Sequence, residues 1–414
     1  MIKLVILDDD PTGIQTVKGC LLVTQWDDDT IREAMTDAEP FFYVLTNTRA
    51  MTRQDAARVV REAMEAVVRV NKELGYQLIF ISRSDSCLRG HFPLETDVMS
   101  DVLREHAIPE WNKKVFCPAF IEAGRYTIDG THYMKEGDRL IPVSETEFAR
   151  DNVFAYKNSV LTEYIREKGC DPDDYIIVDA QSYAELDAFS KSFLAEMQQF
   201  GGSAVIRCSS SLPKSMSDSL PRPLPRRGDE KLENVEHPSL GGDGGGRRGG
   251  LFVVGSHVQK TTRQLEQLLT CDGVSGIELP IEPILDDPEP LFAETIKQMR
   301  ELHDAGLTPV VYTARKEVRI DDADKRQRLG QTVSDFLVRL VREMPFTPSF
   351  LVAKGGITSH DILTHGLGIR SARVLGQILP GVPGIMTEKF PYIIFPGNVG
   401  EVTALREAFL KLKD

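Results

Sequence analysis

Residues 4–13 of the chain read LVILDDDPTG, and this stretch decides the fold. Four apolar residues end abruptly in three aspartates, Asp8, Asp9 and Asp10, and the Thr12-Gly13 pair that follows predicts a turn. A short apolar run that ends at such a turn is typical of a buried strand in a parallel sheet, and ligands bind beyond the carboxyl ends of such strands. Neighbouring carboxylates raise one another's pKa unless a cation compensates them. Three in a row are therefore costly for folding and reasonable in an active site.

The rest of the chain repeats such apolar runs, with helical stretches between them. Asp55 to Leu74, for example, has apolar residues at helical spacing. The alternation predicts an α/β fold of two domains, each with a largely parallel β-sheet flanked by helices, and we expect the active site in the interdomain cleft. The expected strands are 4–7, 78–82, 115–120, 175–180, 204–208, 251–256, 309–314, 349–356 and 392–398. The other expected helices are 259–270, 289–305, 328–343, 358–367 and 400–412.

A Pro- and Gly-rich segment, residues 213–250, interrupts the alternation. It contains PRPLPRRGDEK and GGDGGGRRGG and has almost no apolar periodicity. Such a composition cannot bury enough apolar surface to offset chain entropy, so it predicts a flexible linker or insertion. This leaves an N-terminal domain at 1–212 and a C-terminal domain at 251–414. A second stretch rich in Gly and Pro, LGQILPGVPGIM at 375–386, predicts a rigid ordered loop.

Composition and charge exclude several classes of protein. The 414 residues carry a formal net charge of -13, which argues against a general nucleic-acid binder because such binding needs a basic patch. The six cysteines are scattered without a C-x-x-C pair, and the eight histidines form no H-E-x-x-H, so neither a metal site nor a disulfide framework is expected. No apolar run is long enough for a transmembrane helix, and the first residues lack the pattern of a signal peptide. We expect a cytoplasmic protein without a membrane or nucleic-acid partner.

Charged residues follow two further apolar runs of the N-terminal half. Arg83, Asp85 and Arg89 come after residues 78–82, and Arg125 follows a later run. Arginines hold carboxylates through forked, charge-assisted hydrogen bonds, and an aspartate can bind a sugar hydroxyl and take its proton. Asp and Arg together at neighbouring strand ends therefore predict a polyhydroxy acid as ligand. The alternative is that these residues form ion pairs that tie the loops together.

Three glycine-containing turns follow expected strands in the C-terminal half. Glycine lets a phosphate approach the backbone, and a helix N-terminus offers unpaired N–H groups and the positive end of a dipole. Three such turns on one sheet predict a nucleotide site, although the sequence has no Walker A motif, G-x-x-x-x-G-K-[ST]. The candidate residues are Ser256 in VVGSH, Gly355, Gly356, Ile357 and Thr358 in AKGGITS, and Gly397 and Gly400 in FPGNVG.

The order of these elements resembles the four-carbon acid sugar kinases over nearly the whole chain outside residues 213–250. Asp8-Asp9-Asp10-Pro11-Thr12-Gly13 is similar to the family's Ala-Asp-Asp-Leu-Thr-Gly. Asp85-Ser86-Cys87-Leu88-Arg89-Gly90 is similar to its Asp-Ser-Thr-Leu-Arg-Gly, with Arg83 where a Lys is usual. Further similar segments are Pro118-Ala119-Phe120 with Gly124-Arg125 and Asp129-Gly130, VVGSHVQKTTRQL at 253–265, and GQILPGVP at 376–383. Ile357 departs from the family, which has Asp at this position.

The resemblance implies ATP-dependent phosphorylation of a terminal hydroxyl of a tetronate or 3-oxo-tetronate, in carbohydrate-acid catabolism. On this reading Asp9 or Asp10 is the catalytic carboxylate. Mg²⁺ accompanies ATP and is held by phosphates and water, with few protein ligands. The acid sugar is bound by Asp85, Arg83, Arg89 and Arg125. ATP is bound near Ser256, Gly355, Gly356, Ile357, Thr358, Gly397 and Gly400.

Two other functions fit the same residues. A sugar-acid isomerase, epimerase or aldolase would use the Asp and Arg residues without ATP, and the glycine turns speak against it. The second alternative is a non-catalytic homologue that binds the acid or the nucleotide, and Ile357 is the residue that supports it. The sequence leaves open the stereochemistry of the acid sugar and whether the chain forms a homo-oligomer.

Overall fold

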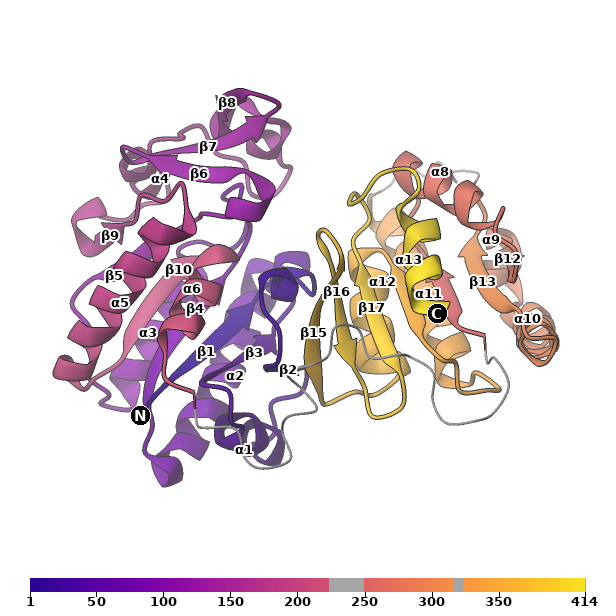
Figure 1. Ribbon diagram of the computed structural model, residues 1–414, viewed down its shortest axis with the longest axis horizontal. Coiled ribbons are helices and arrows are strands. Elements are labelled where there is room, and N and C mark those ends of the chain that lie inside the picture. Colours follow the sequence, from indigo (N-terminus) through magenta and orange to yellow (C-terminus); the bar gives the residue numbers. More distant parts are fainter. Residues whose placement is uncertain (223–248, 316–322, 414) are drawn as a thin grey trace. The chain divides into compact units, whose positions relative to one another are not determined.

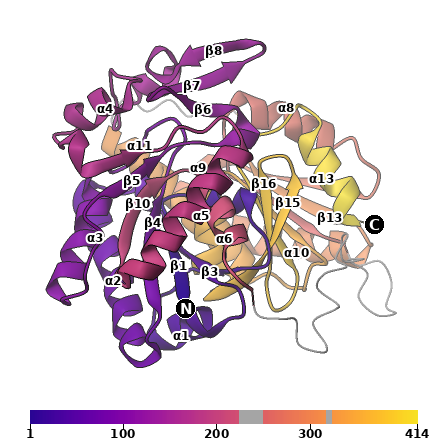
Figure 2. The ribbon, with the colours of Figure 1, turned by 60° about the vertical axis from the view of Figure 1, so that its left-hand side comes forward.

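The computed structural model of the protein describes residues 1–222, 249–315 and 323–413. The chain forms two compact units, Met1–Pro223 and Leu224–Asp414, which Figures 1 and 2 show from two sides. Each unit has a largely parallel sheet flanked by helices, so the predicted α/β class is confirmed. Within the described ranges, no helix is both long enough and apolar enough to cross a membrane.

The sheet of the first unit has the strand order β2-β3-β1-β4-β10-β5-β9, and neighbouring strands are parallel. Strands that are buried on both faces read as continuous apolar runs, and each run predicted in this half contains a strand. Strands β2 and β3 were not predicted. The bounds are β1 Ile2–Asp8, β2 Leu21–Val23, β3 Phe41–Leu45, β4 Gln77–Arg83, β5 Lys114–Cys117, β9 Tyr175–Ile177 and β10 Ala204–Cys208.

Helices cover both faces of this sheet. Helices α1, α2 and α3 pack on one face against apolar strand residues such as Val5 and Phe80, and α5 and α6 lie on the other face (Figure 1). Helix α2 begins where the Thr52 hydroxyl accepts a hydrogen bond from the N–H of Asp55 (3.2 Å) and ends at Gly75 in the left-handed region. The bounds are α1 Asp28–Thr36, α2 Arg53–Leu74, α3 Leu94–Glu105, α4 Leu161–Glu167, α5 Tyr183–Phe200 and α6 Ser211–Ser219.

A small antiparallel sheet, β6-β7-β8, belongs to the first unit and packs beside the loop that follows β4. Its Met134 shares an apolar cluster with Leu88 of that loop and Tyr164 of α4. A ring nitrogen of His132 is hydrogen-bonded to the carbonyl of Ser86 (2.8 Å). The small sheet therefore fixes the loop in place. Its strands are β6 Arg125–Ile128, β7 Thr131–Glu136 and β8 Arg139–Pro142.

The sheet of the second unit has the order β12-β13-β11-β14-β17-β16-β15. Its first five strands are parallel, and β16 and β15 add an antiparallel hairpin. Helices α8 and α13 pack on one face with Phe252 and Phe395, and α10 and α12 contact strands as well. The strands are β11 Leu251–Val254, β12 Val274–Leu279, β13 Thr308–Thr313, β14 Leu351–Lys354, β15 Ser371–Leu379, β16 Val382–Met386 and β17 Pro391–Phe395. The helices are α8 Gln259–Leu268, α9 Ile281–Asp286, α10 Pro288–Asp304, α11 Ala323–Arg342, α12 Gly356–Asp361, the π-helix η7 Ile362–Gly366 and α13 Ala404–Lys413.

Two predictions from Gly and Pro content are wrong. Residues 375–386 are not a loop but most of the β15–β16 hairpin, whose turn is Pro380-Gly381 with Gly381 at φ +75°. The predicted linker of 213–250 begins too early, because α6 continues to Ser219 and buries Met216. Pro213 is compatible with this helix because it lies in the first turn. Residues 223–248 of the predicted linker lie outside the described residues.

Candidate active site

The first aspartate of the acidic turn, Asp8, is buried at the end of β1. Arg83, its register partner in β4, donates from Nη1 to Asp8 Oδ1 (3.0 Å) and from Nη2 to the Ser210 hydroxyl (2.7 Å). Burial raises the pKa of Asp8 to about 7, although the Arg83 guanidinium acts in the opposite direction. Gly13 is needed beside this pair, because a Cβ atom there would lie 1.9 Å from Asp8 Oδ2. Arg83 is thus engaged by a carboxylate of the protein.

Arg49 holds the other two aspartates of the turn. It comes from the 3₁₀-helix η2 (Thr48–Ala50) after β3 and donates two hydrogen bonds to Asp9, one of them from Nε (3.1 Å), and one from Nη1 to Asp10 (3.0 Å). Ser84 also donates to Asp9, whose side chain is 1% exposed, whereas that of Asp10 is 24% exposed. Burial would raise the pKa of Asp10, but Arg49 and other donors outweigh burial and lower it. Asp10 is therefore the ionised carboxylate of the turn that a ligand can reach.

Asp85 and Arg89 form a forked pair on the loop after β4. Arg89 donates from Nε and Nη2 to the two carboxylate oxygens of Asp85 (2.9 and 3.1 Å). Arg49 Nη1 lies 3.8 Å from the same carboxylate. Burial would raise the pKa of Asp85, but Arg49 and Arg89 outweigh burial and hold that pKa well below its ordinary value. Both residues therefore belong to the ionic network of the acidic turn.

Arg207, near the end of β10, supports this loop from the core of the unit. It donates from Nη1 to Glu95 (2.8 Å) and to the Ser82 hydroxyl (2.9 Å), and from Nη2 to the carbonyl of Arg89 (3.3 Å). Gly90, at φ +119°, is required at this contact, because a Cβ atom there would lie 2.9 Å from Arg207 Nη2 and closer still to Ser84. The loop geometry thus depends on a buried ion pair between β10 and α3.

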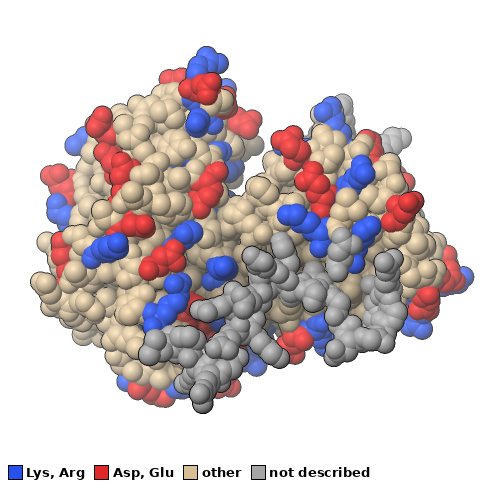
Figure 3. All heavy atoms as spheres, viewed as in Figure 1, with Lys and Arg blue, Asp and Glu red and all other residues tan. Residues whose placement is uncertain are grey.

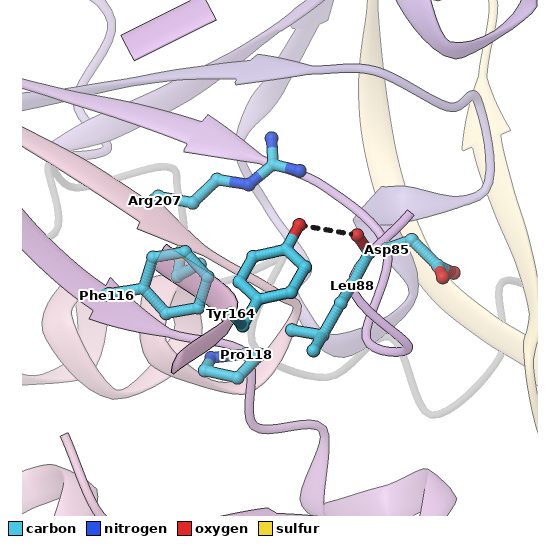
Figure 4. A pocket seen from close by; sticks show the side chains of 7 residues that line it. Asp85, Leu88, Phe116, Pro118, Tyr164 and Arg207 are labelled. Carbon is cyan, nitrogen blue, oxygen red and sulfur yellow. Dashed lines mark hydrogen bonds between the residues drawn. The ribbon is translucent and has the colours of Figure 1, made fainter. Parts of the chain in front are cut away.

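A small pocket lies beside Arg207, between the loop and α4. Figure 4 shows the Tyr164 hydroxyl pointing at the carbonyl of Leu88, to which it donates a hydrogen bond of 2.9 Å. The side chains that line the pocket are mostly apolar, so this bond and the Arg207 guanidinium are its main polar features. The lining residues are Asp85, Leu88, Phe116, Pro118, Tyr164, Arg207 and Cys208.

Arg125 differs from the other predicted arginines. It is the first residue of β6 and donates from Nη1 to the carbonyl of Ala123. Its guanidinium lies near the thiol of Cys87, on the same loop as Asp85. Its Nε is buried without a hydrogen-bond partner, and no carboxylate of the described residues lies within 4.0 Å of its guanidinium. Arg125 is therefore the predicted arginine without a carboxylate partner among the described residues.

The glycine turns of the second unit lie close to one another. Ser256 follows β11, and its hydroxyl lies 3.0 Å from that of Thr261, which donates to the carbonyl of Gly397 (3.1 Å). Gly355 has φ +122°, and a Cβ atom there would lie 3.3 Å from the side chains of Ser256 and Thr358. Close approach of the three turns thus accounts for the glycines.

Three other candidates of the second unit lie nearby. Gly400, at φ +83°, has a carbonyl that accepts a hydrogen bond from Gln264 (3.4 Å). Gly356 begins α12 and has open space where a Cβ atom would lie. The next side chain, Ile357, is 63% exposed, so it makes no contribution to the core of the unit. An exposed apolar side chain at this turn offers no ligand atom to a metal or a phosphate.

Three buried or half-buried cations of these sites were not predicted. Arg49 stands in TNTR directly after the FFYVL run at 41–45, a strand signal that would have placed it at the same sheet edge as Asp10. Arg207 lies within the apolar run AVIRC, and Lys354 is the last residue of the run LVAK. A charged residue in an otherwise apolar strand is the sequence feature that could have identified each of them. Their partners come from other elements and cannot be read from spacing.

Neither the charged residues visible in Figure 3 nor the His, Cys, Asp and Glu side chains of the described residues indicate another kind of ligand. On the face in Figure 3, acidic and basic side chains are interspersed, and the residues drawn in colour form no extended basic patch. Among the residues that the structure describes, no group of three or more His, Cys, Asp or Glu side chains could hold a metal ion.

Comparison with protein families divides the chain in the same way as the structure. Residues 4–172 match the model of a sugar-binding N-terminal domain, and residues 251–405 match that of a nucleotide-binding C-terminal domain. The chain is thus a two-domain protein with one sugar-binding and one nucleotide-binding domain. This combination fits the four-carbon acid sugar kinase family, in agreement with the resemblance of the sequence motifs.

Two solved structures have a similar fold. One is Haemophilus influenzae protein HI1011, assigned to DUF1537, with a TM-score of 0.65 and 16% identity over 98% of both chains. The other is a Salmonella typhimurium LT2 protein with a provisional description as a tRNA synthase, with a TM-score of 0.67 and 16% identity over 99% of both chains. At this identity the likeness shows the fold alone. No curated protein matched the chain.

Proposed function

We propose that the chain is an ATP-dependent kinase that phosphorylates a terminal hydroxyl of a four-carbon acid sugar, a tetronate or 3-oxo-tetronate. One observation carries the proposal. The sugar-binding domain gathers Asp10, Asp85 and the arginines at one edge of its sheet, and the same chain has a nucleotide-binding domain whose glycine turns converge. Phosphoryl transfer depends mainly on positioning and on charge stabilisation, which these two sites together would supply.

Asp10 is the best candidate for the carboxylate that orients and deprotonates the acceptor hydroxyl. It is ionised, partly exposed, and fixed by hydrogen bonds from Arg49 and from the backbone N–H of Thr12 (2.8 Å). Asp9 is a weaker candidate, because its oxygens are taken by Arg49 and Ser84 and it is buried. A positioned carboxylate of this kind typically contributes about 10²- to 10⁴-fold to a rate.

Arg125 is the best candidate for binding the carboxylate of the acid sugar. The guanidinium groups of Arg83, Arg49 and Arg89 are each bound to aspartates, so their charge is compensated before a substrate arrives. Arg125 has no such partner among the described residues. Asp85 and Arg89 would then contribute to sugar binding indirectly, because their ion pair holds the loop after β4 in place.

ATP would bind at Ser256, Gly355, Thr358 and the Gly397 turn, where backbone N–H groups can approach phosphates. Mg²⁺ would be held mainly by the phosphates and water. The transfer requires the bound hydroxyl and the γ-phosphate to meet, and exclusion of water at that moment would prevent loss of ATP.

A coupled ADP-release assay over a panel of short aldonic and oxo-aldonic acids tests the proposal. ADP release that requires both Mg²⁺-ATP and one of these acids is the expected result, and Asp10→Asn should abolish most of it. Asp28→Asn is the matched control, because Asp28 is an exposed aspartate of the same unit that binds Arg69 (3.0 Å). Conversion of an acid without ATP would establish an isomerase or aldolase instead. Thermal stabilisation by the ligands without ADP release would establish a binding protein.

A further inference from the structure

Lys354 is a buried lysine at the centre of the nucleotide-binding domain. It is the last residue of β14 and is 0% exposed. In the sheet it lies between Val254 of β11 and Phe395 of β17. The segments that follow these two strands are the Ser256 turn and the Gly397 turn. Lys354 itself precedes Gly355, so it adjoins the three glycine turns.

The hydrogen bonds of Lys354 join these turns. Its Nζ donates to the carbonyls of Pro396 (2.6 Å) and Gly397 (3.2 Å). Its own carbonyl accepts a hydrogen bond from the N–H of Gly255 (3.2 Å). One residue therefore fixes the turn after β17 against the turn after β11.

These bonds also set the direction of backbone N–H groups. In a planar trans peptide the N–H points opposite to the C=O of the preceding residue. Because the carbonyls of Pro396 and Gly397 point at Lys354, the N–H groups of Gly397 and Asn398 point away from it. Two successive N–H groups on one side of a turn form the kind of concavity that binds an anion.

Lys354 has no anionic partner among the described residues, although its Nζ lies 4.1 Å from the centre of the Phe395 ring, whose face attracts a cation. Lys3 is a useful comparison, because it is equally buried and donates to two backbone carbonyls, those of Asp37 (2.9 Å) and Glu39 (2.6 Å). The carboxylates of those same residues lie near Lys3 and favour its charged form. Lys354 has no carboxylate of the described residues within 4.0 Å, and its charged neighbour is another cation, Lys260. A buried ammonium without a counter-charge is unfavourable.

We propose that Lys354 is a positioning residue of the nucleotide site, which holds the N–H groups of residues 397 and 398 towards the phosphates of the nucleotide. The phosphates supply the negative charge that the protein around Lys354 lacks. The inference rests on the proposed function, because it deepens the assignment of the glycine turns to ATP. It applies to the phosphates alone, so Lys354 affects binding of ADP far more than binding of adenosine.

Titration calorimetry with ADP–Mg²⁺ and with adenosine tests the inference on the full chain and on Lys354→Met. The affinity for ADP should fall about ten- to a hundredfold, the range expected for hydrogen bonds from a charged group. The affinity for adenosine should change less than about threefold. Lys354→Gln, which retains an N–H donor but is shorter and carries no charge, should give a smaller loss with the same selectivity, and it serves as the test if the Met variant does not fold. Lys3→Met is the matched control, because it removes a lysine of the same kind from the other unit and should leave both affinities unchanged.

The outcomes separate the inference from the proposed function. If the parental chain binds ADP and the two Lys354 variants bind it equally well, the inference is overturned and the kinase proposal stands. Equal losses for ADP and adenosine would also overturn it, because they would indicate a general disturbance of the domain. If the parental chain binds no nucleotide, the proposed function is wrong, and the inference, which rests on it, is wrong as well.

Discussion

Replacement of Arg49 by Met removes the cation that joins three carboxylates. Arg49 makes three hydrogen bonds to Asp9 and Asp10 and lies 3.8 Å from Asp85. Its side chain is 18% exposed, so solvent would replace only part of what is lost. Removing one partner of a buried pair costs about 3–5 kcal/mol, because it leaves charge without compensation. We expect a loss of this size in the free energy of unfolding of the first unit at pH 7.

The loss depends on pH in a defined direction. The pKa of Asp10 and that of Asp85 are lowered in the folded protein, with Arg49 as the leading favourable partner of both. A lowered pKa contributes stability that is present above the unfolded value near 3.8 and is lost as the pH falls. Arg49→Met lacks this contribution, and its carboxylates become protonated more readily. The difference between the two proteins is therefore fully present at pH 7 and at pH 5, and it shrinks as the pH falls below the unfolded value near 3.8.

Tryptophan fluorescence in urea measures this difference. The two tryptophans of the chain, Trp26 and Trp111, both lie in the first unit, so the signal reports on that unit alone. Arg69→Met is the matched control, because Arg69 also forks onto a carboxylate, that of Asp28, but with a side chain that is 55% exposed. It should cause little change at any pH. Equal stability of Arg49→Met and the parental chain at pH 7, or a difference that does not shrink as the pH falls below 3.8, would refute the reasoning.

Three further results are expected. Asp10→Asn should lower kcat in the ADP-release assay by about 10²-fold or more while the protein remains folded, and parental turnover would remove Asp10 from the mechanism. Arg125→Ala should raise the KM for the acid sugar by about tenfold or more, as the loss of a charged hydrogen bond requires, with a smaller effect on kcat; an unchanged KM would exclude Arg125 from the carboxylate site. Gly90→Ala should destabilise the first unit more than Gly75→Ala, because both add about 1–3 kcal/mol of backbone strain at positive φ but only Gly90 faces Ser84 and Arg207. Equal midpoints in urea would contradict this.

The sequence predicts the sheets well because their strands are buried on both faces. Continuous apolar runs such as LIFIS are detectable without knowledge of their partners. Gly and Pro were misleading in the β15–β16 hairpin, where they form a turn and bulges within strands. The same residues cannot distinguish an irregular loop from a hairpin unless the pairing of the strands is known.

The candidate site was predicted only in part, and the missing residues share a physical reason. Arg207 pairs with Glu95, which is 112 positions away, and Lys354 bonds to carbonyls 42 and 43 positions away. Such pairs come together only when the sheet has formed, so no spacing in the sequence reveals them. Asp10, Asp85 and Arg89 could be proposed from the sequence because they lie in the loops that follow β1 and β4, where the topology alone places them at one edge of the sheet.

The three consecutive aspartates are tolerated because the backbone divides them between two cations. Asp8 is the last residue of β1 and meets Arg83, its register partner in β4, whereas Asp9 and Asp10 lie in the turn beyond the strand and meet Arg49. Each cation comes from a strand adjacent to β1, β4 in one case and the segment after β3 in the other. The charge repulsion within the turn is thus offset by the sheet itself. It follows that the arginines nearest the acidic turn stabilise it, and this is why the proposed function assigns recognition of the anionic substrate to Arg125, a cation outside this arrangement.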